Sequence, residues 1–235
     1  MFSGKLYKNV FDPTIIKQIA ENLKTLDNKE TLIYENDNTT VRSIFAPHWF
    51  DNTLKEFVNT NPMIDIVKGI IGTDVYTHQV HFNYKSANIG GEYAWHSDYT
   101  FWQAHDGMPS VNALSLLFLL DDMTLENGPL EVLPGSENFL VEKKDKNWTI
   151  KHDANETDGM ITENMVSITG LQRHTVLGNA GDVYVMHANM WHTSGRNTSS
   201  KDRNVLFICY NSVDNKTTKT DRPDYITLRD FTPVG

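Results

Sequence analysis

The stretch Tyr93–Pro109, YAWHSDYTFWQAHDGMP, gathers two tryptophans, two histidines and two aspartates within seventeen residues. His96 and Asp98 lie two residues apart in it. On extended backbone this spacing points both side chains to one face, so the two can bind a single metal ion. An imidazole and a carboxylate suit Fe(II), and a triad of two histidines and one carboxylate leaves positions open for a cosubstrate and dioxygen. The stretch therefore predicts a strand that carries iron, provided that a third ligand follows.

A histidine further along the chain has to complete the site. The candidates are His174, His187 and His192. His192 is the preferred candidate, because Ser194 and Arg203 follow it and Arg203 stands at the start of the apolar strand VLFICYN. An arginine binds a carboxylate through two parallel hydrogen bonds. His187 stays the main alternative, since Arg196 lies within ten residues of it.

Composition limits the class of protein. The chain has 235 residues, a net charge of −9 and one cysteine, Cys209. The length is normal for a single all-β sandwich or barrel, so we predict one domain over residues 1–235. A negative chain disfavours binding to nucleic acid or to an anionic membrane, and it fits a small polar substrate better. The N-terminal stretch MFSGKLYKNVFDP lacks the apolar core of a signal peptide, which together with the lone cysteine predicts a cytoplasmic protein.

Helical and extended patterns divide the chain near residue 74. Asp12 and Pro13 are typical of a helix start, and a second helix is predicted from about residue 62 to 71, ending at Gly72. Later runs rich in β-branched and aromatic residues predict strands: VYTHQVHFNYK, VNALSLLFLL, GPLEVLPG, DVYVMH and NVLFICYNSV. We therefore expect residues 1–73 to be mainly helical and residues 74–235 to form a strand-built core with the helices outside it.

A polar segment, residues 138–173, interrupts the strand pattern. It is rich in lysine, asparagine, aspartate, glutamate and threonine. Long loops in compact domains are commonly lids or solvated excursions, and the sequence leaves both interpretations open. The four lysines between positions 143 and 151 fit a solvated face better than a contact with substrate.

Ordered motifs from about residue 74 to the C-terminus carry a family resemblance. They are H-Q-V-x-x-N (78–83), W-H-S-D (95–98), W-x-x-x-D-G-M-P (102–109), N-G-P-L (127–130), P-G-S (134–136) and H-x-S-x-x-N-x-S-x-x-x-R (192–203). With them the chain resembles the phytanoyl-CoA dioxygenase superfamily of Fe(II)/2-oxoglutarate-dependent oxygenases. Within that superfamily it is most similar to the ectoine hydroxylases and related hydroxylases of free amino acids. The tail RPDYITLRDFTP, residues 222–233, also resembles that group.

The resemblance implies a fold, a set of cofactors and roles for individual residues. The fold is a double-stranded β-helix, the cupin-like jelly roll, with a mainly β core and flanking N-terminal helices. The cofactors are Fe(II), 2-oxoglutarate as cosubstrate, and dioxygen. The implied iron ligands are His96, Asp98 and His192. Arg203 would pair with the distal carboxylate of 2-oxoglutarate, helped by Ser194, Asn83 and Tyr93. The implied substrate contacts are Gln79, His81, Trp102 and Phe207.

Three departures from the ectoine hydroxylases bear on the substrate. Those enzymes carry arginine where this chain has His81, and glutamate where it has Thr100; many relatives carry histidine where it has Glu137. A neutral imidazole at position 81 cannot make the contacts of a guanidinium. We therefore predict a hydroxylase of a small polar substrate, a free amino acid or amino-acid derivative, and keep ectoine 5-hydroxylation as the alternative.

Other interpretations of the same residues stay open. A non-enzymatic jelly-roll module that binds a metal or ligand would keep the fold without needing Arg203. A zinc hydrolase would use the same ligands and gain nothing from that arginine. Trp102 fits either the core or an apolar wall beside the substrate. Asp106 and His105 are expected to make loop hydrogen bonds rather than to transfer protons.

Overall fold

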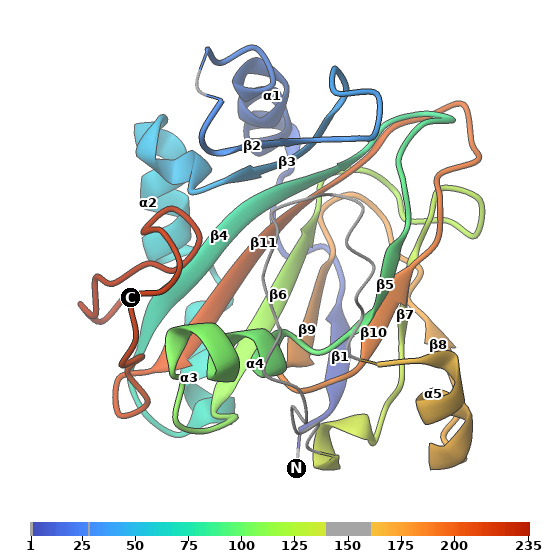
Figure 1. The fold of residues 1–235 in the computed structure, drawn as a ribbon. Helices are drawn as coiled ribbons and strands as arrows, with labels where there is room; N and C mark the ends of the chain where they lie inside the picture. The colour runs from blue at the N-terminus through green and yellow to red at the C-terminus, as the bar shows by residue number, and fades with distance from the viewer. Residues whose placement is uncertain (1, 28, 140–160) are drawn as a thin grey trace.

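Two antiparallel sheets face each other in the computed structural model, which describes residues 2–27, 29–139 and 161–235. The larger sheet has the order β1-β9-β6-β11-β4-β3-β2 and the smaller one the order β5-β10-β7-β8 (Figure 1). The large-sheet strands are β1 (Gly4–Tyr7), β2 (Leu32–Tyr34), β3 (Val41–Phe45), β4 (Val75–Lys85), β6 (Ala113–Leu119), β9 (Val183–His187) and β11 (Arg203–Ser212). The small-sheet strands are β5 (Tyr93–His96), β7 (Leu130–Val132), β8 (His174–Thr175) and β10 (His192–Ser194). This arrangement confirms the predicted jelly roll.

Helices cover the outer face of the larger sheet. They are α1 (Thr14–Leu23), α2 (Asn52–Thr60) and α3 (Ile64–Ile71). Their apolar residues, such as Ile16, Leu54 and Val67, form one core cluster with alternate residues of the central strands, among them Phe82 and Phe118. Burying a side chain of this kind is favourable by about 1.5–3 kcal/mol, so the helices anchor one face of the sheet.

The inner face of the larger sheet points toward the smaller sheet and carries the polar side chains of the site. Side chains alternate between faces along a strand, so Val80 and Phe82 pack under the helices while His81 and Asn83 point inward. The antiparallel register sets Phe207 of β11 between His81 of β4 and Leu117 of β6. Along each central strand, alternate side chains therefore belong to the core under the helices and to the cavity between the sheets.

The N-terminal part is less helical than the sequence predicted. The two predicted helices exist, the first beginning at Thr14, whose backbone N–H donates to the Asp12 carboxylate, and the other ending at Gly72 in the left-handed conformation. However, β1, β2 and β3 also lie in residues 1–73 and extend both edges of the larger sheet. These strands have three to five residues each, too few for the alternation of apolar and polar residues to identify them.

Short helices occur in the loops around the site. These are α4 (Asp98–Phe101), the π-helical turn Trp102–Asp106, α5 (Glu163–Thr169) and the 3-10 turns Pro47–Trp49 and Ser136–Asn138. Helix α5 belongs to the polar segment for which a lid was considered, and it packs through Val166 against Trp95 and Trp191. Most of that segment, residues 140–160, lies outside the described residues. The prediction of a lid or a solvated loop falls on those residues and stays a prediction.

The C-terminal segment, residues 213–235, follows β4 beyond the point where β3 ends. Leu228 donates a backbone hydrogen bond to the carbonyl of His78, and Val234 donates one to that of Val75. Figure 1 shows this segment, in red, next to β4. The segment thus places its own side chains near one end of the inner face. No helix in the described ranges is long and apolar enough to cross a membrane.

Substitutions at two glycines can test how local backbone geometry contributes to the stability of this fold. Gly181 precedes β9 with a φ of +92°, and a Cβ there would lie 2.7 Å from the carbonyl oxygen of Phe11. We expect Gly181→Ala to lower the free energy of unfolding by about 1–3 kcal/mol. The control is Gly69→Ala on the exposed side of α3, where nothing lies within 4 Å and a gain of about 0.5–1 kcal/mol is expected. Urea unfolding measures both, and an unchanged stability of Gly181→Ala would contradict the argument.

Candidate metal centre and cofactor pocket

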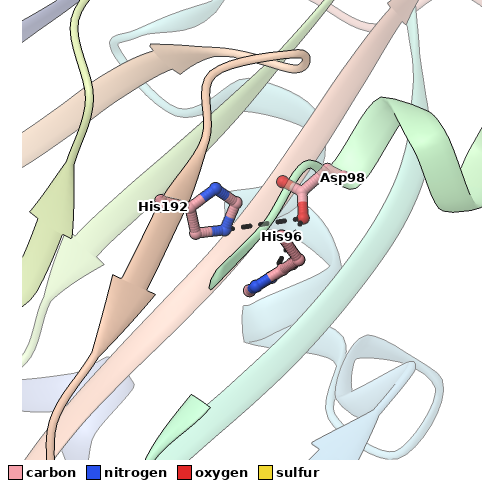
Figure 2. A group of neighbouring side chains, drawn as sticks. All are labelled: His96, Asp98 and His192. Atoms are coloured by element: carbon pink, nitrogen blue, oxygen red, sulfur yellow. Dashed lines mark ion pairs between the residues drawn. The ribbon is translucent and has the colours of Figure 1, made fainter. Parts of the chain in front are cut away.

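Three side chains from three elements converge at one end of the smaller sheet. His96 ends β5, Asp98 begins α4 and His192 begins β10. Asp98 Oδ1 lies 3.8 Å from His96 Nε2 and 3.7 Å from His192 Nε2. Figure 2 shows the three side chains pointing toward one another. One ligand atom from each can be chosen so that all lie within 4.8 Å of one another, which suits a single metal ion.

The backbone sets the orientation of both imidazole rings. His96 Nδ1 lies 2.7 Å from the carbonyl oxygen of Ala94, and His192 Nδ1 lies 2.9 Å from that of Met190. A carbonyl only accepts hydrogen bonds, so each Nδ1 carries the proton and each Nε2 presents its lone pair to the centre. Burial, with the neighbouring His192, lowers the pKa of His96 to about 4. The ring is therefore neutral at pH 7, as a metal ligand has to be.

The loops that carry the three side chains are tied to each other. Ser97, which is fully buried, donates a 2.8 Å hydrogen bond to the amide oxygen of Asn189. The backbone N–H of Tyr99 donates to the carbonyl of Ala188 at 3.0 Å. These contacts join the turn after β5 to the turn before β10. The positions of the three side chains consequently depend on one connected unit.

The structure distinguishes the three histidines considered for the third position. His192 lies with His96 and Asp98, as preferred from the sequence. His187 ends β9, and its Nδ1 accepts a hydrogen bond from the backbone N–H of Asn189 at 3.1 Å. His174 is exposed on β8. In the described part of the chain, the group suited to a metal includes neither His187 nor His174.

A cavity of about 300 Å³ opens beside these three side chains, between the two sheets. Its wall includes each residue that the sequence analysis assigned to cosubstrate or substrate: Asn83, Tyr93, Ser194, Arg203, Gln79, His81, Trp102 and Phe207. These residues therefore lie together around one cavity, and the individual role of each stays a prediction.

Arg203 is a buried cation with an unsatisfied hydrogen-bond donor. Its side chain reaches the cavity from the start of β11, and Nη2 donates to the carbonyl of Gly128 at 2.6 Å. Within the described residues, Nε has no hydrogen-bond partner. Burial lowers its pKa to about 10, so the guanidinium is still charged at pH 7. A buried charge with a free N–H is poised for a carboxylate.

Polar residues around Arg203 form a connected set. Asn83 Oδ1 accepts hydrogen bonds from Ser43 Oγ at 2.7 Å and from the Tyr93 hydroxyl at 3.3 Å. The guanidinium of Arg42 lies 3.8 Å from the centre of the Tyr93 ring and pairs with Glu35. Ser43 and Arg42 were missed from the sequence, because their strand was not predicted.

An aromatic stack forms another wall of the cavity. The His81 ring lies parallel to Phe207 at 4.7 Å between ring centres and against Phe45 at 5.1 Å. Burial lowers the pKa of His81 to about 4, so the ring is neutral at pH 7. Trp102 is 2% exposed and contacts the cavity and the His78 ring together. Trp102 therefore belongs to a buried cluster and also lines the cavity, and its contact with substrate stays a prediction.

Arg222 is the main cavity residue that sequence analysis did not single out. It comes from the C-terminal segment, and its Nε donates to Asp106 Oδ1 at 2.8 Å while Nη2 contacts Oδ2. Asp106 is fully buried and also accepts from Thr227 Oγ1 at 2.7 Å. Burial opposes its ionisation, but contacts with His78 and Arg222 bring its pKa below the usual range. The expected loop hydrogen bond is thus a buried ion pair that anchors the tail.

Comparison with known proteins indicates the same class of protein as the sequence motifs. The chain matches the family model described as Phytanoyl-CoA dioxygenase (PhyH) over residues 6–205. It is 31% identical to L-proline trans-4-hydroxylase of Streptomyces griseoviridis, covering 95% of this chain and 87% of that protein. It is 30% identical to an ectoine dioxygenase of Nocardia farcinica, covering 93% of this chain and 76% of the relative.

A solved structure superposes over nearly the whole chain. EctD from S. alaskensis, crystallised with 2-oxoglutarate and 5-hydroxyectoine, has a TM-score of 0.85 and 27% identity, covering 97% of this chain and 80% of that one. Fold, site and relatives together define an Fe(II)- and 2-oxoglutarate-dependent dioxygenase. The chain belongs to the phytanoyl-CoA dioxygenase (PhyH) family.

The choice between the two C-terminal histidines leads to a test. We expect His192→Ala to weaken Fe(II) binding strongly, as His96→Ala and Asp98→Ala should, because two remaining ligands cannot hold the ion firmly. His187→Ala, which removes a similarly buried imidazole outside the group, is the matched control. Anaerobic competition with a chromogenic chelator measures the affinity. Loss of iron in His187→Ala with retention in His192→Ala would reverse the assignment.

Proposed function

We propose that the protein hydroxylates a free amino acid or amino-acid derivative, with His96, Asp98 and His192 holding Fe(II). The observation that carries the proposal is the grouping of these three side chains on the wall of a cavity that also contains the buried guanidinium of Arg203, whose Nε has no hydrogen-bond partner among the described residues. A metal-binding module without chemistry would have no use for a buried arginine with a free donor beside its metal. Membership of the dioxygenase family favours the enzyme over that module and over a zinc hydrolase.

The donor set fits iron and leaves room for the other reactants. Two imidazoles and one carboxylate converge on one point of the cavity wall, and the cavity of about 300 Å³ lies beside them. When bound, Fe(II) supplies the oxygen chemistry, in which 2-oxoglutarate is oxidised to succinate and CO2 and one oxygen atom goes to the substrate. The protein's part is to hold the reactants in position and to exclude water from them.

The cosubstrate is assigned to the Arg203 end of the cavity. We infer that the distal carboxylate of 2-oxoglutarate pairs with Arg203, whose Nε has no partner in the part of the chain that the structure describes. Ser194, on the same strand as His192, and the pair Asn83 and Tyr93 lie on the same cavity wall and can add hydrogen bonds. Charge-assisted pairing of this kind in a buried site is strong and sensitive to geometry.

The substrate is assigned to the end formed by Gln79, Trp102 and Arg222. Asp106 occupies Nε and Nη2 of Arg222, which leaves Nη1 for a carboxylate. Gln79 Nε2 donates to the carbonyl of Ile226 at 2.8 Å, so its amide oxygen can accept from an ammonium group. An α-amino acid presents both partners on one carbon. The neutral stack of His81 and Phe207 then suits the apolar part of that molecule.

L-Proline is the first substrate to test and ectoine the second. A relative of this chain is named L-proline trans-4-hydroxylase, and others are named ectoine dioxygenases. A small saturated ring with a carboxylate and a secondary ammonium matches the arrangement described above. Ectoine also carries a carboxylate, but the uncharged His81 offers it no further cationic contact. The substrate is a small molecule in either case.

The function is tested by product formation. Purified enzyme with Fe(II) and 2-oxoglutarate is expected to form succinate together with a hydroxylated product from proline or another free amino acid. Mass spectrometry of the product and a succinate assay measure the two yields. A kcat/KM for ectoine above that of each amino acid would contradict the amino-acid assignment. If neither ectoine nor any of the amino acids tested stimulated succinate formation, the proposed substrate class would be contradicted.

The role of Arg203 leads to a separate prediction. Arg203→Ala is expected to raise the KM for 2-oxoglutarate at least tenfold, since losing a buried charge-assisted partner costs about 2–5 kcal/mol. The control is Arg196→Ala, which removes an exposed arginine from the neighbouring loop. Direct titration of 2-oxoglutarate into the iron-loaded protein measures the same loss. Equal affinity in Arg203→Ala and Arg196→Ala would remove the role from Arg203.

The role of Arg222 can be tested with a matched ligand. Arg222→Gln is expected to raise the KM for the amino acid and to leave the KM for 2-oxoglutarate within about twofold, because the two sites use different arginines. L-Prolinamide, which lacks the carboxylate, should bind poorly to the wild type and lose little further in Arg222→Gln. If the acid and the amide lost affinity equally in this variant, Arg222 would not contact the carboxylate.

A further inference from the structure

Ser115 is a fully buried hydroxyl in the middle of the larger sheet. It lies in β6, whose sequence ALSLLFL is otherwise apolar. Neighbouring strands cover both edges of β6 at this point, with Met186 of β9 on one side and Cys209 of β11 on the other. Burying a hydroxyl in such a place is unfavourable unless it makes a hydrogen bond.

The partner is the carboxylate at the metal centre. Ser115 Oγ donates to Asp98 Oδ2 at 2.6 Å. The other oxygen of the same carboxylate, Oδ1, is the one that lies 3.8 and 3.7 Å from the two imidazole Nε2 atoms. The two oxygens thus have different surroundings: one faces the histidines and the other is held by the sheet.

Cys209 makes a further contact with the Ser115 hydroxyl. Its sulfur lies 3.6 Å from Ser115 Oγ and is buried. A carboxylate that binds a metal carries no proton, so the single hydroxyl proton of Ser115 points to Asp98. The thiol is then the donor in its contact with Ser115. The hydrogen bonds run in one direction, from Cys209 to Ser115 to Asp98.

We propose that Ser115 is a positioning residue that holds Asp98 Oδ2 and so directs Oδ1 alone to the iron. The inference rests on the proposed function, because it assigns a task toward the metal. Asp98 begins a short helix, whereas Ser115 belongs to a central strand fixed on both sides. Without the hydroxyl, the carboxylate is free to rotate and to offer both oxygens. A second oxygen would take space needed by the cosubstrate or dioxygen.

Residues that orient a metal ligand set both affinity and productive chemistry. Removing such a contact typically weakens metal binding 10- to 100-fold. It should also raise the amount of succinate formed per molecule of hydroxylated product, because a poorly held centre consumes 2-oxoglutarate without hydroxylating the substrate. A serine that only filled space would change neither quantity when replaced by a group of the same shape.

The test compares two variants of equal size. Ser115→Thr keeps the hydroxyl and Ser115→Val replaces it with a methyl group, so any cost of the added carbon in the core is common to both. Anaerobic Fe(II) titration against a competing chelator should give a dissociation constant at least tenfold weaker for Ser115→Val than for Ser115→Thr. The ratio of succinate to hydroxylated product should be higher for Ser115→Val.

A control and a second deletion complete the experiment. Ser212→Ala removes another fully buried serine hydroxyl, bonded to Thr73 at the far end of β11, and should bind iron as the wild type does. Ser115→Ala should bind iron as weakly as Ser115→Val. Equal iron affinity and equal coupling in Ser115→Val and Ser115→Thr would overturn the role of Ser115. Failure of the wild type itself to bind Fe(II) would instead overturn the proposed function.

Discussion

The antiparallel pairing of β5 with β10 is the constraint on which the site depends. Its register sets His192 directly opposite His96, so two imidazoles from distant parts of the chain reach one point. A shift by one residue would turn each side chain of the strand to the other face. Asp98 joins them from the turn that follows β5, and the contact of Ser97 with Asn189 ties that turn to the approach of β10. Register and loop contacts together define where a metal can bind.

Two arginines of the cavity differ in the groups that neutralise their charge, and this difference distinguishes the two ends of the cavity. Arg222 is paired with Asp106, whereas Arg203 has a backbone carbonyl as partner for Nη2 and none in the described residues for Nε. A buried unpaired charge is unfavourable, so an incoming dianion gains most beside Arg203. A zwitterionic amino acid brings no net charge and suits the end where the arginine is already neutralised. The charge pattern therefore supports the proposed separation of cosubstrate from substrate.

Much of this site could be predicted from the sequence, because local motifs carry it. The spacing of His96 and Asp98 and the frame from His192 to Arg203 are short-range patterns that can be recognised even though the strands that hold the two histidines, β5 and β10, have only four and three residues. The contact of Asp106 with Arg222 joins residues 116 positions apart, and nothing in the local sequence pairs them. Ser43 was missed for a different reason, since a five-residue strand has too little periodicity to predict.

His81 shows how the cavity can select by shape where charge is missing. Its ring is covered on both sides by Phe45 and Phe207, and burial keeps it neutral. The ectoine hydroxylases that this sequence resembles carry an arginine at this position, and a guanidinium there would have to be desolvated or paired. A stacked imidazole has no such requirement and leaves a flat, weakly polar wall. In the proposed arrangement ionic recognition is left to Arg222, which favours a substrate that carries its charged groups on one side and its hydrocarbon on the other, as an α-amino acid does.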